Sequence, residues 1–211
     1  MSFAQTLNSK FKIILASASP RRKELMELAG LEFDIWPSDK EEAVTSTVPK
    51  EICMELSRQK AEDVAASIKT YNESHEDLVT PTDMLIIGAD TIVALGDTVF
   101  GKPRDEDDAR RMLNALSGNT HSVFTGVTFV FMSSSGRVGE HVFCEETKVT
   151  FCDLDEDDID SYIATGDPFD KAGSYGVQTS SAVFVRSIEG DFFNVMGLPI
   201  SGMMQELKRI V

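Results

Sequence analysis

Two adjacent arginines stand where a helix normally begins with acids. Residues 14–22 have the pattern of a short apolar strand, a Ser/Ala turn and a helix start, with Ser19 at the N-cap and Pro20 at the first helical position. A helix N-terminus carries partial positive charge, so Arg21 and Arg22 are unfavourable there unless an anion lies above them. Free N–H groups and two guanidinium groups could bind a phosphate; the alternative is two solvated side chains at an ordinary helix start.

A carboxylate interrupts the most apolar segment of the chain. Asp90 stands within residues 84–95, which are apolar on both strand faces and predict the middle of a sheet. A buried carboxylate is unfavourable unless it is paired, hydrogen-bonded or metal-bound, so Asp90 is a candidate metal ligand or general base. In the alternative interpretation the strand ends at Ile87 and Asp90 caps a turn, although residues 91–93 resume the strand pattern at once.

Further charged side chains could join that carboxylate. Lys102 follows a predicted hairpin and could return beside it, Lys60 lies on a predicted helix, and an acid cluster of Asp39, Glu41 and Glu42 follows the second predicted strand. By pattern alone, each of these groups is also typical of ordinary solvated side chains. The pattern therefore leaves both interpretations open.

Residues 167–178 form a predicted loop that combines glycines, charges, an aromatic side chain and the amide of Gln178. Such a loop could wrap a small ligand, although one loop alone is a weak signal. The histidines show no metal-ligand spacing, and the chain has no Walker A, GxGxxG or GxSxG motif. Together, a phosphate-binding helix start, a buried acid, nearby lysines and this loop indicate Mg²⁺-type chemistry on a phosphorylated small molecule.

The elements that must position these groups alternate between strand and helix, and long strands then pair locally. Strands are predicted at 12–16, 33–36, 84–95, 98–100, 122–132, 142–153 and, as a hairpin, 183–188 with 192–195; helices at 20–29, 50–67, 105–116, 155–164 and 198–211. Residues 71–82 are predicted to be a solvated loop. This order predicts a mixed α/β sheet, with a cleft where the Ser19 helix start meets the ends of the central strands.

The composition of the chain limits the kinds of partner that it could bind. The chain has 211 residues, of which 42% are hydrophobic, enough for a substantial core. A net charge of −15 argues against binding to polymeric nucleic acid or to an anionic membrane. The three cysteines show no metal spacing and indicate reduced thiols, and no targeting or membrane-spanning segment is evident, so we expect a cytoplasmic protein.

Six motifs occur in an order that resembles the Maf family of nucleoside triphosphate pyrophosphatases, and the resemblance covers nearly the whole chain from Lys12 onward. The motifs are Ser17-Ala18-Ser19-Pro20-Arg21-Arg22, Gly88-Ala89-Asp90-Thr91-Ile92-Val93, Gly101-Lys102-Pro103, Leu116-Ser117-Gly118, Asp170-Lys171-Ala172-Gly173-Ser174-Tyr175-Gly176-Val177-Gln178 and Asn194-Val195-Met196-Gly197-Leu198-Pro199.

The resemblance implies an α/β fold with an elongated mixed β-sheet, flanked by helices in two lobes with a central cleft, like that of inosine triphosphatases. It implies a single domain over residues 1–211, in which residues 1–11 are an N-terminal extension that we expect to be flexible. The implied activity is hydrolysis of a nucleoside triphosphate to the monophosphate and pyrophosphate with Mg²⁺ or Mn²⁺. The oligomeric state is left open, with a homodimer as one candidate.

The resemblance also implies roles for single residues. Asp90 matches the family's catalytic proton acceptor, and Glu42 falls at an acidic position that we carry over as a metal or water-positioning residue beside it. Glu42 is chosen over Glu41 by an ungapped alignment through Trp36. The residues expected to bind substrate are Ser17, Arg21, Arg22, Lys60, Thr91, Lys102, Lys171 and Gln178.

The subgroup follows from three positions. A branch that acts on 7-methyl-GTP has other residues where this chain has Arg21, Thr91 and Gln178, so the chain resembles the dTTP/UTP-type branch. A side-chain amide can both donate to and accept from a uracil or thymine edge. Two other classes compete with this interpretation. A nucleotide-binding regulator of cell division would not need an acid in an apolar strand, and a structural module would leave the arginines unexplained.

Overall fold

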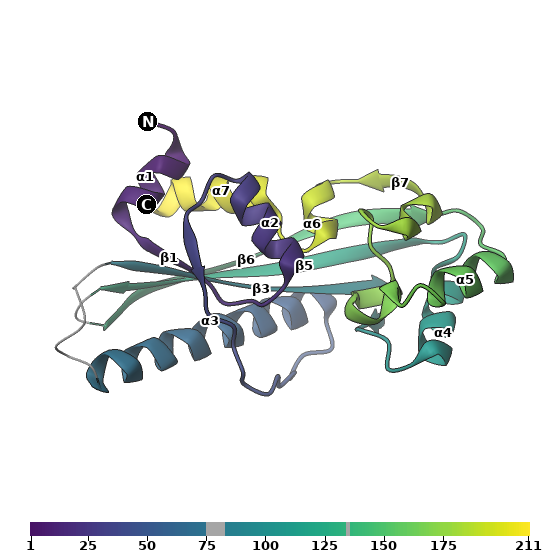
Figure 1. Ribbon diagram of the computed structural model, residues 1–211, viewed down its shortest axis with the longest axis horizontal. Helices are drawn as coiled ribbons and strands as arrows, with labels where there is room; N and C mark the ends of the chain where they lie inside the picture. The colour runs from purple at the N-terminus through teal and green to yellow at the C-terminus, as the bar shows by residue number, and fades with distance from the viewer. Residues whose placement is uncertain (75–82, 134–135) are drawn as a thin grey trace.

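The computed structural model describes residues 1–74, 83–133 and 136–211. One elongated seven-stranded sheet runs through the molecule in the order β2-β1-β3-β5-β6-β7, with β4 paired to β3 (Figure 1). The strands are β1 (Lys12–Leu15), β2 (Phe33–Ile35), β3 (Met84–Leu95), β4 (Thr98–Phe100), β5 (Thr120–Ser133), β6 (Gly136–Phe151) and β7 (Val185–Glu189). β1 is parallel to β2 and β3, and the other pairs are antiparallel, which confirms the predicted mixed sheet.

A single long helix covers one face of the sheet. The helix α3 (Pro49–Ser74) lies along β3 and β5 and extends beyond the predicted end at residue 67 (Figure 1). Its close approach depends on Gly88 and Gly126, because a Cβ at either position would collide with a carbonyl oxygen of α3, that of Ser57 or of Cys53. The predicted loop at 71–82 is wrong at residues 71–74, which continue α3, and residues 75–82 lie outside the described residues.

The opposite face is covered at one end by α1 (Phe3–Lys10), α2 (Pro20–Leu28) and α7 (Ile200–Ile210). The expectation of a flexible extension at 1–11 differs from the structure. Ser2 and Gln5 form a capping box at the start of α1, and the fully buried Leu7 packs with β1 and α7 in one hydrophobic cluster. Phe3, Ala4 and Phe11 pack against the same cluster, but these few apolar residues among polar ones were too weak a pattern to predict this docking.

The other end of the sheet carries α4 (Glu106–Leu116), α5 (Glu156–Ile163) and three short 3₁₀ helices, η2 (Asp167–Asp170), η3 (Ala172–Ser174) and η4 (Ser180–Phe184). A separate core cluster, which includes Phe151 and Tyr162, joins them. The predicted strand at 192–195 is wrong: α6 (Phe192–Met196) forms there, capped by Asp191 and closed by Gly197 at φ +116°. Among the described residues, no helix combines the length and apolar character that crossing a membrane demands.

A gap along one edge of β3 separates these two groups of helices. β5 pairs with the other edge of β3 from Met84 to Ala94, whereas β1 pairs only up to Ile87 and β4 only from Val93. Within the described chain, residues 88–92 therefore have no strand partner on this edge. This opening is where a ligand could approach both faces of the central strand.

Candidate active site

A pocket of about 360 Å³ lies at the open edge of β3. It contains nine of the ten residues proposed from the sequence to bind substrate or metal, and Ser17 stands behind it against Arg22. The nine are Arg21, Arg22, Glu42, Lys60, Asp90, Thr91, Lys102, Lys171 and Gln178. These residues come from six separate segments, so only the fold brings them together.

Neighbouring residues of β3 serve the pocket from opposite faces. Asp90 points toward α3, where it contacts Lys60, whereas the hydroxyl of Thr91 accepts a hydrogen bond from Arg22 of α2 at 3.1 Å. Successive side chains alternate across a strand, and the open edge lets both of them reach one cavity. The strand continues through Asp90 to Leu95, so the turn-cap interpretation of Asp90 is wrong.

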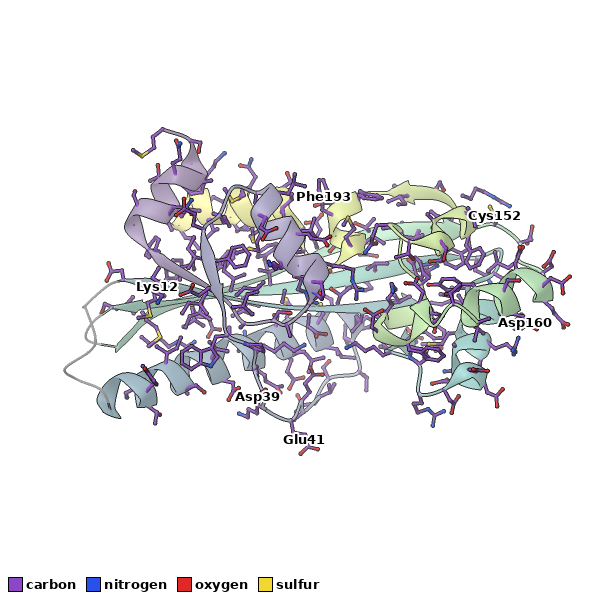
Figure 2. The ribbon with its side chains drawn as sticks, viewed as in Figure 1. Lys12, Asp39, Glu41, Cys152, Asp160 and Phe193 are labelled. Atoms are coloured by element: carbon purple, nitrogen blue, oxygen red, sulfur yellow. The ribbon has the colours of Figure 1, made fainter. Side chains whose placement is uncertain are left out.

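Lys60 joins two carboxylates. Its ammonium contacts Asp90 Oδ1 and lies 2.9 Å from Glu42 Oε1. The side chains of Lys60 and Asp90 are 19% and 12% exposed, so this ion pair is shielded from water, while Glu42 is half-exposed. Asp39 and Glu41 do not line the pocket, and Glu41 points away from the molecule (Figure 2). The geometry therefore separates Glu42 from the rest of the acid cluster.

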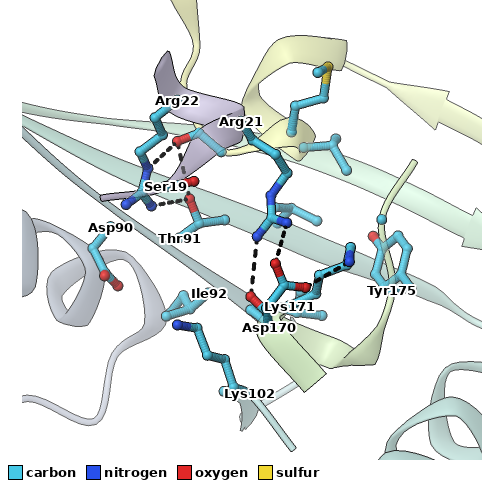
Figure 3. A pocket seen from close by; sticks show the side chains of 18 of the residues that line it. Ser19, Arg21, Arg22, Asp90, Thr91, Ile92, Lys102, Asp170, Lys171 and Tyr175 are labelled. Carbon is cyan, nitrogen blue, oxygen red and sulfur yellow. Dashed lines mark hydrogen bonds and ion pairs between the residues drawn. The ribbon is translucent and has the colours of Figure 1, made fainter. Parts of the chain in front are cut away.

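The first turn of α2 is held by Arg22. The Nε group of Arg22 donates to the carbonyl of Gly197 at 2.9 Å, and Nη1 donates to Ser17 Oγ at 3.2 Å. Its Nη2 group donates to Thr91 Oγ1 (Figure 3). Ser19 occupies the N-cap position without a side-chain capping bond, and its N–H donates to Ser17 Oγ instead. Desolvation lowers the pKa of Arg22, although the Asp90 charge opposes that shift.

Arg21 reaches across the pocket. Its guanidinium donates to the Asp170 carboxylate at 2.8 Å and to the Asp170 carbonyl at 3.2 Å (Figure 3). Lys171 is buried, and its ammonium donates to the carbonyl and carboxylate of Asp167 and to the carboxylate of Asp170. Burial opposes ionisation of Asp170, but its bonds to Lys171 and Arg21 outweigh this, and its pKa is lowered. Lys171 thus supports Asp170 in the free protein.

Lys102 extends into the pocket from the segment after β4 (Figure 3). Within the part of the chain that the structure describes, it has no ion-pair partner closer than 4.0 Å, unlike Lys60, Lys171 and Arg21. Gln178 is exposed and lines the same cavity as Tyr175. A free cation and an exposed amide are both available to a ligand without displacing an internal partner.

Tyr175 lines the pocket, is buried, and is held in place by a contact on its side away from the pocket. Its hydroxyl lies 2.8 Å from Nε2 of the buried His121, and desolvation raises the pKa of the Tyr175 hydroxyl. Desolvation also lowers the pKa of His121 to about 4, so its imidazole is neutral at pH 7. This pairing holds one orientation of the tyrosine ring.

Sequence reasoning missed several lining residues. Asp170, Tyr175 and Gly197 stand in quoted motifs but were given no role. A signal for Asp170 was its position beside Lys171, since an acid next to a basic phosphate-site residue suggests an internal partner. The carbonyl role of Gly197 carries no side-chain signal at all.

The carboxylates fit a divalent metal. Glu42 and Asp90 come from different segments and converge on one cation, the Lys60 ammonium, beside the pocket. No group of three or more acidic, histidine or cysteine ligands occurs among the described residues. Two carboxylates completed by substrate phosphates are an ordinary set of ligands for Mg²⁺. These residues therefore fit a metal that is shared with a polyphosphate.

Fold and pocket together define an α/β protein with a cleft that is lined by both cationic and acidic side chains. The family model described as Maf-like protein matches residues 12–210, and the chain belongs to this family.

Two relatives of this chain have the same name. The chain is 57% identical over 94% of its length to a dTTP/UTP pyrophosphatase of Agathobacter rectalis, of which it covers 97%. It is 46% identical over 94% of its length to one of Lachnoclostridium phytofermentans, covering 95% of that protein. Among solved structures, a HAM1 protein from Coxiella burnetii aligns with a TM-score of 0.46 at 13% identity, over 94% of this chain and 99% of that chain.

Proposed function

We propose that this chain hydrolyses nucleoside triphosphates, with a preference for dTTP and UTP, to the monophosphate and pyrophosphate. The observation that carries the proposal is the meeting of Asp90, Glu42 and Lys60 with Arg21 and Lys102 in one pocket. The name dTTP/UTP pyrophosphatase, borne by two relatives that match over 94% of the chain, supports the same reaction and the pyrimidine preference.

The cations would bind the phosphate chain. Lys102 is free to bind phosphate oxygens, and Arg21 becomes available when a phosphate replaces the Asp170 carboxylate, since guanidinium binds both groups with the same geometry. Arg22 and Ser17 would act mainly by fixing the shape of the turn, because three of the arginine's N–H groups already have partners. Lys60 would move from the carboxylates toward the phosphates.

Asp90 would act on water. In the proposed step a water oxygen bonds to a phosphorus atom, the bridging P–O bond breaks, and the water proton passes to a carboxylate oxygen of Asp90. A positioned general base contributes about 10²–10⁴-fold in rate. Shielding of the Asp90 carboxylate from bulk water makes its charge more effective at the reacting atoms.

A divalent metal, Mg²⁺ or Mn²⁺, would be held by Glu42 and Asp90. When bound it would withdraw charge from the phosphate oxygens as the P–O bond breaks. The residues of the chain supply the negative charge that such an ion requires, and Lys60 balances that charge in the free protein.

Gln178 would select the base. Its amide is exposed in the pocket and could pair with both the donor and the acceptor of a uracil or thymine edge. Thr91 is one of the residues expected to bind substrate, but its hydroxyl already bonds to Arg22 and lies 3.0 Å from Thr125 Oγ1. Thr91 would therefore act through Arg22.

The cytoplasm, where nucleoside triphosphates are available, is the compartment we propose, and a homodimer remains a prediction. The deciding experiment measures pyrophosphate release from a panel of ordinary triphosphates with Mg²⁺ and with Mn²⁺. Faster turnover of dTTP and UTP than of GTP and ATP is expected. Tight binding without turnover would instead support the nucleotide-binding regulator, and a preference for 7-methyl-GTP would contradict the assigned branch alone.

A further inference from the structure

Two of the three cysteines face each other across the sheet–helix interface. Cys53 lies in the first turns of α3 and Cys144 lies on β6, and their sulfur atoms are 3.4 Å apart although 91 residues separate them in the sequence. The third cysteine, Cys152, follows β6 near β7, at the far end of the molecule from the start of β6 (Figure 2). The fold thus creates one thiol pair and one separate thiol.

The two paired thiols have different surroundings. Cys53 is fully buried, and its sulfur lies 3.2 Å from the carbonyl oxygen of Lys50, a second acceptor within reach of its single thiol hydrogen. Cys144 is only half-buried. The hydrogen bond with Cys53 lowers the pKa of Cys144, and the Lys50 charge acts in the same direction, whereas the same bond and burial raise the pKa of Cys53. A half-buried cysteine whose pKa is lowered, beside a fully buried thiol, is the usual arrangement of a reactive cysteine and its resolving partner.

We propose that Cys144 and Cys53 form a modification site that reacts with small hydroperoxides and closes to a reversible disulfide. The Cys144 thiolate attacks a peroxide oxygen and becomes a sulfenic acid, and the O–O bond breaks to release water or an alcohol. The Cys53 sulfur then attacks the Cys144 sulfur, an S–S bond forms, and the sulfenic oxygen leaves as water. Two thiols are oxidised and one hydroperoxide is reduced, so atoms and electrons balance.

The site is connected to the pocket through α3. Cys53 packs in one apolar cluster with Ile52, Leu56 and Ile92, and both Leu56 and Ile92 line the pocket. An S–S bond is about 2.05 Å long, so the sulfurs must approach each other by more than 1 Å. The carbonyl of Cys53 already lies against Gly126, which leaves the helix backbone little room there. Oxidation would therefore covalently join α3 to β6 beside the pocket.

The test uses the purified full chain, fully reduced and then exposed to hydrogen peroxide. Free thiols should fall from three to one, and peptide mass mapping should show a Cys53–Cys144 link that dithiothreitol reverses. Cys152→Ser should leave the loss of two thiols unchanged. Cys53→Ser, with Cys53→Ala as a second version of the same change, should stop at a sulfenic acid on Cys144 that dimedone traps.

Two results would overturn the proposal. One is a parent protein that keeps all three thiols at peroxide levels which oxidise free cysteine. The other is oxidation that falls first on Cys152 or that gives only irreversible acids at Cys144. Each result is independent of nucleotide hydrolysis, because thiols and masses are measured without a substrate.

Discussion

The ammonium of Lys60 lies 2.9 Å from a carboxylate oxygen of Glu42 and also contacts Asp90. It thereby occupies the place between two acids that a divalent cation would take. When a ligand can bind only after an internal partner has moved away, its apparent affinity is reduced in proportion to the fraction of protein molecules in which the site is free. In the free protein, Lys60 therefore competes with a metal for the two acids.

Replacing Lys60 tests this competition. Lys60→Gln should bind Mn²⁺ without nucleotide more tightly than the parent, by about 10-fold if the lost competition is worth about 1.4 kcal/mol. Electron paramagnetic resonance of free Mn²⁺ measures the binding directly. Lys69→Gln, a change at another α3 lysine outside the pocket, is the control. Equal Mn²⁺ affinity in the parent and in Lys60→Gln would contradict the competition.

Asp90→Asn should remove nearly all hydrolysis while the protein stays folded. Losing a general base costs about 10²–10⁴-fold in rate, and losing a metal ligand adds to that loss. The measurement is kcat with dTTP at saturating Mg²⁺, together with the thermal midpoint. Asp97→Asn, in the exposed turn between β3 and β4, should leave both unchanged. Near-normal kcat in Asp90→Asn would remove this residue from the mechanism.

Replacing each of the two arginines of α2 should have a different effect, on stability for Arg22 and on substrate binding for Arg21. Arg22→Ala removes the three hydrogen bonds that Arg22 donates to the Gly197 carbonyl, Ser17 and Thr91, and should lower the free energy of unfolding by about 1–3 kcal/mol. Arg21→Ala removes a partly exposed ion pair, worth about 1 kcal/mol at most, but should raise KM for triphosphates. Urea unfolding and steady-state kinetics of both variants measure this split. The reverse pattern would show that the roles are exchanged.

Base preference should depend on Gln178. Gln178→Ala should reduce the ratio of kcat/KM for UTP over GTP more than it reduces kcat for UTP, because a site that hydrogen-bonds a base edge rejects mismatched partners. Ser180→Ala, another exposed position just beyond, is the matched control. An unchanged ratio in Gln178→Ala would place base selection elsewhere in the pocket.

His121 makes stability depend on pH. The pKa of His121 is about 4 in the folded protein and 6.5 for an unperturbed histidine, as in the unfolded chain. The unfolded chain therefore binds more protons than the folded protein below about pH 6.5. Its contribution is thus complete above that pH and is lost as pH falls toward 4, by about 2 kcal/mol between pH 7.5 and 5. Urea unfolding at the two pH values measures it. His121→Gln should show a smaller pH difference, and an equal one would rule out this histidine as the source.

Local signals predicted much of the fold. The helices α4 and α5 begin with Asp105 and Asp155 as side-chain caps, and the Gly96–Asp97 turn joins β3 to β4 as expected. The segment at 192–196 was mistaken for a strand because its apolar residues are too few to distinguish the two periods. In the structure, Asn194 lies in α6 and is buried, and its side chain donates to the Val123 carbonyl; this tertiary contact favours the helix over a strand.

The composition of the pocket was predictable, but its internal pairing was not. The resemblance to the Maf family placed Asp90, Lys60 and Lys102 among the expected site residues. The bonds of Arg22 to Thr91 and to Gly197 span 69 and 175 residues, and no local pattern encodes them. The contact between Cys53 and Cys144 is hidden for the same reason, since it depends on how closely α3 rests on Gly126.

At the open edge of β3, the two faces of the strand present different chemical groups to the pocket, so the site depends on which residues face which side. Asp90 faces the acid–lysine side and Thr91 the arginine side only because odd and even positions of one strand alternate. Deleting a single residue between Gly88 and Asp90 would exchange the two faces and present a hydroxyl to Lys60 and a carboxylate to Arg22. The positions of both groups therefore depend on the alternation of side chains along one short segment of β3. An insertion or deletion of one residue there would be more damaging than most substitutions.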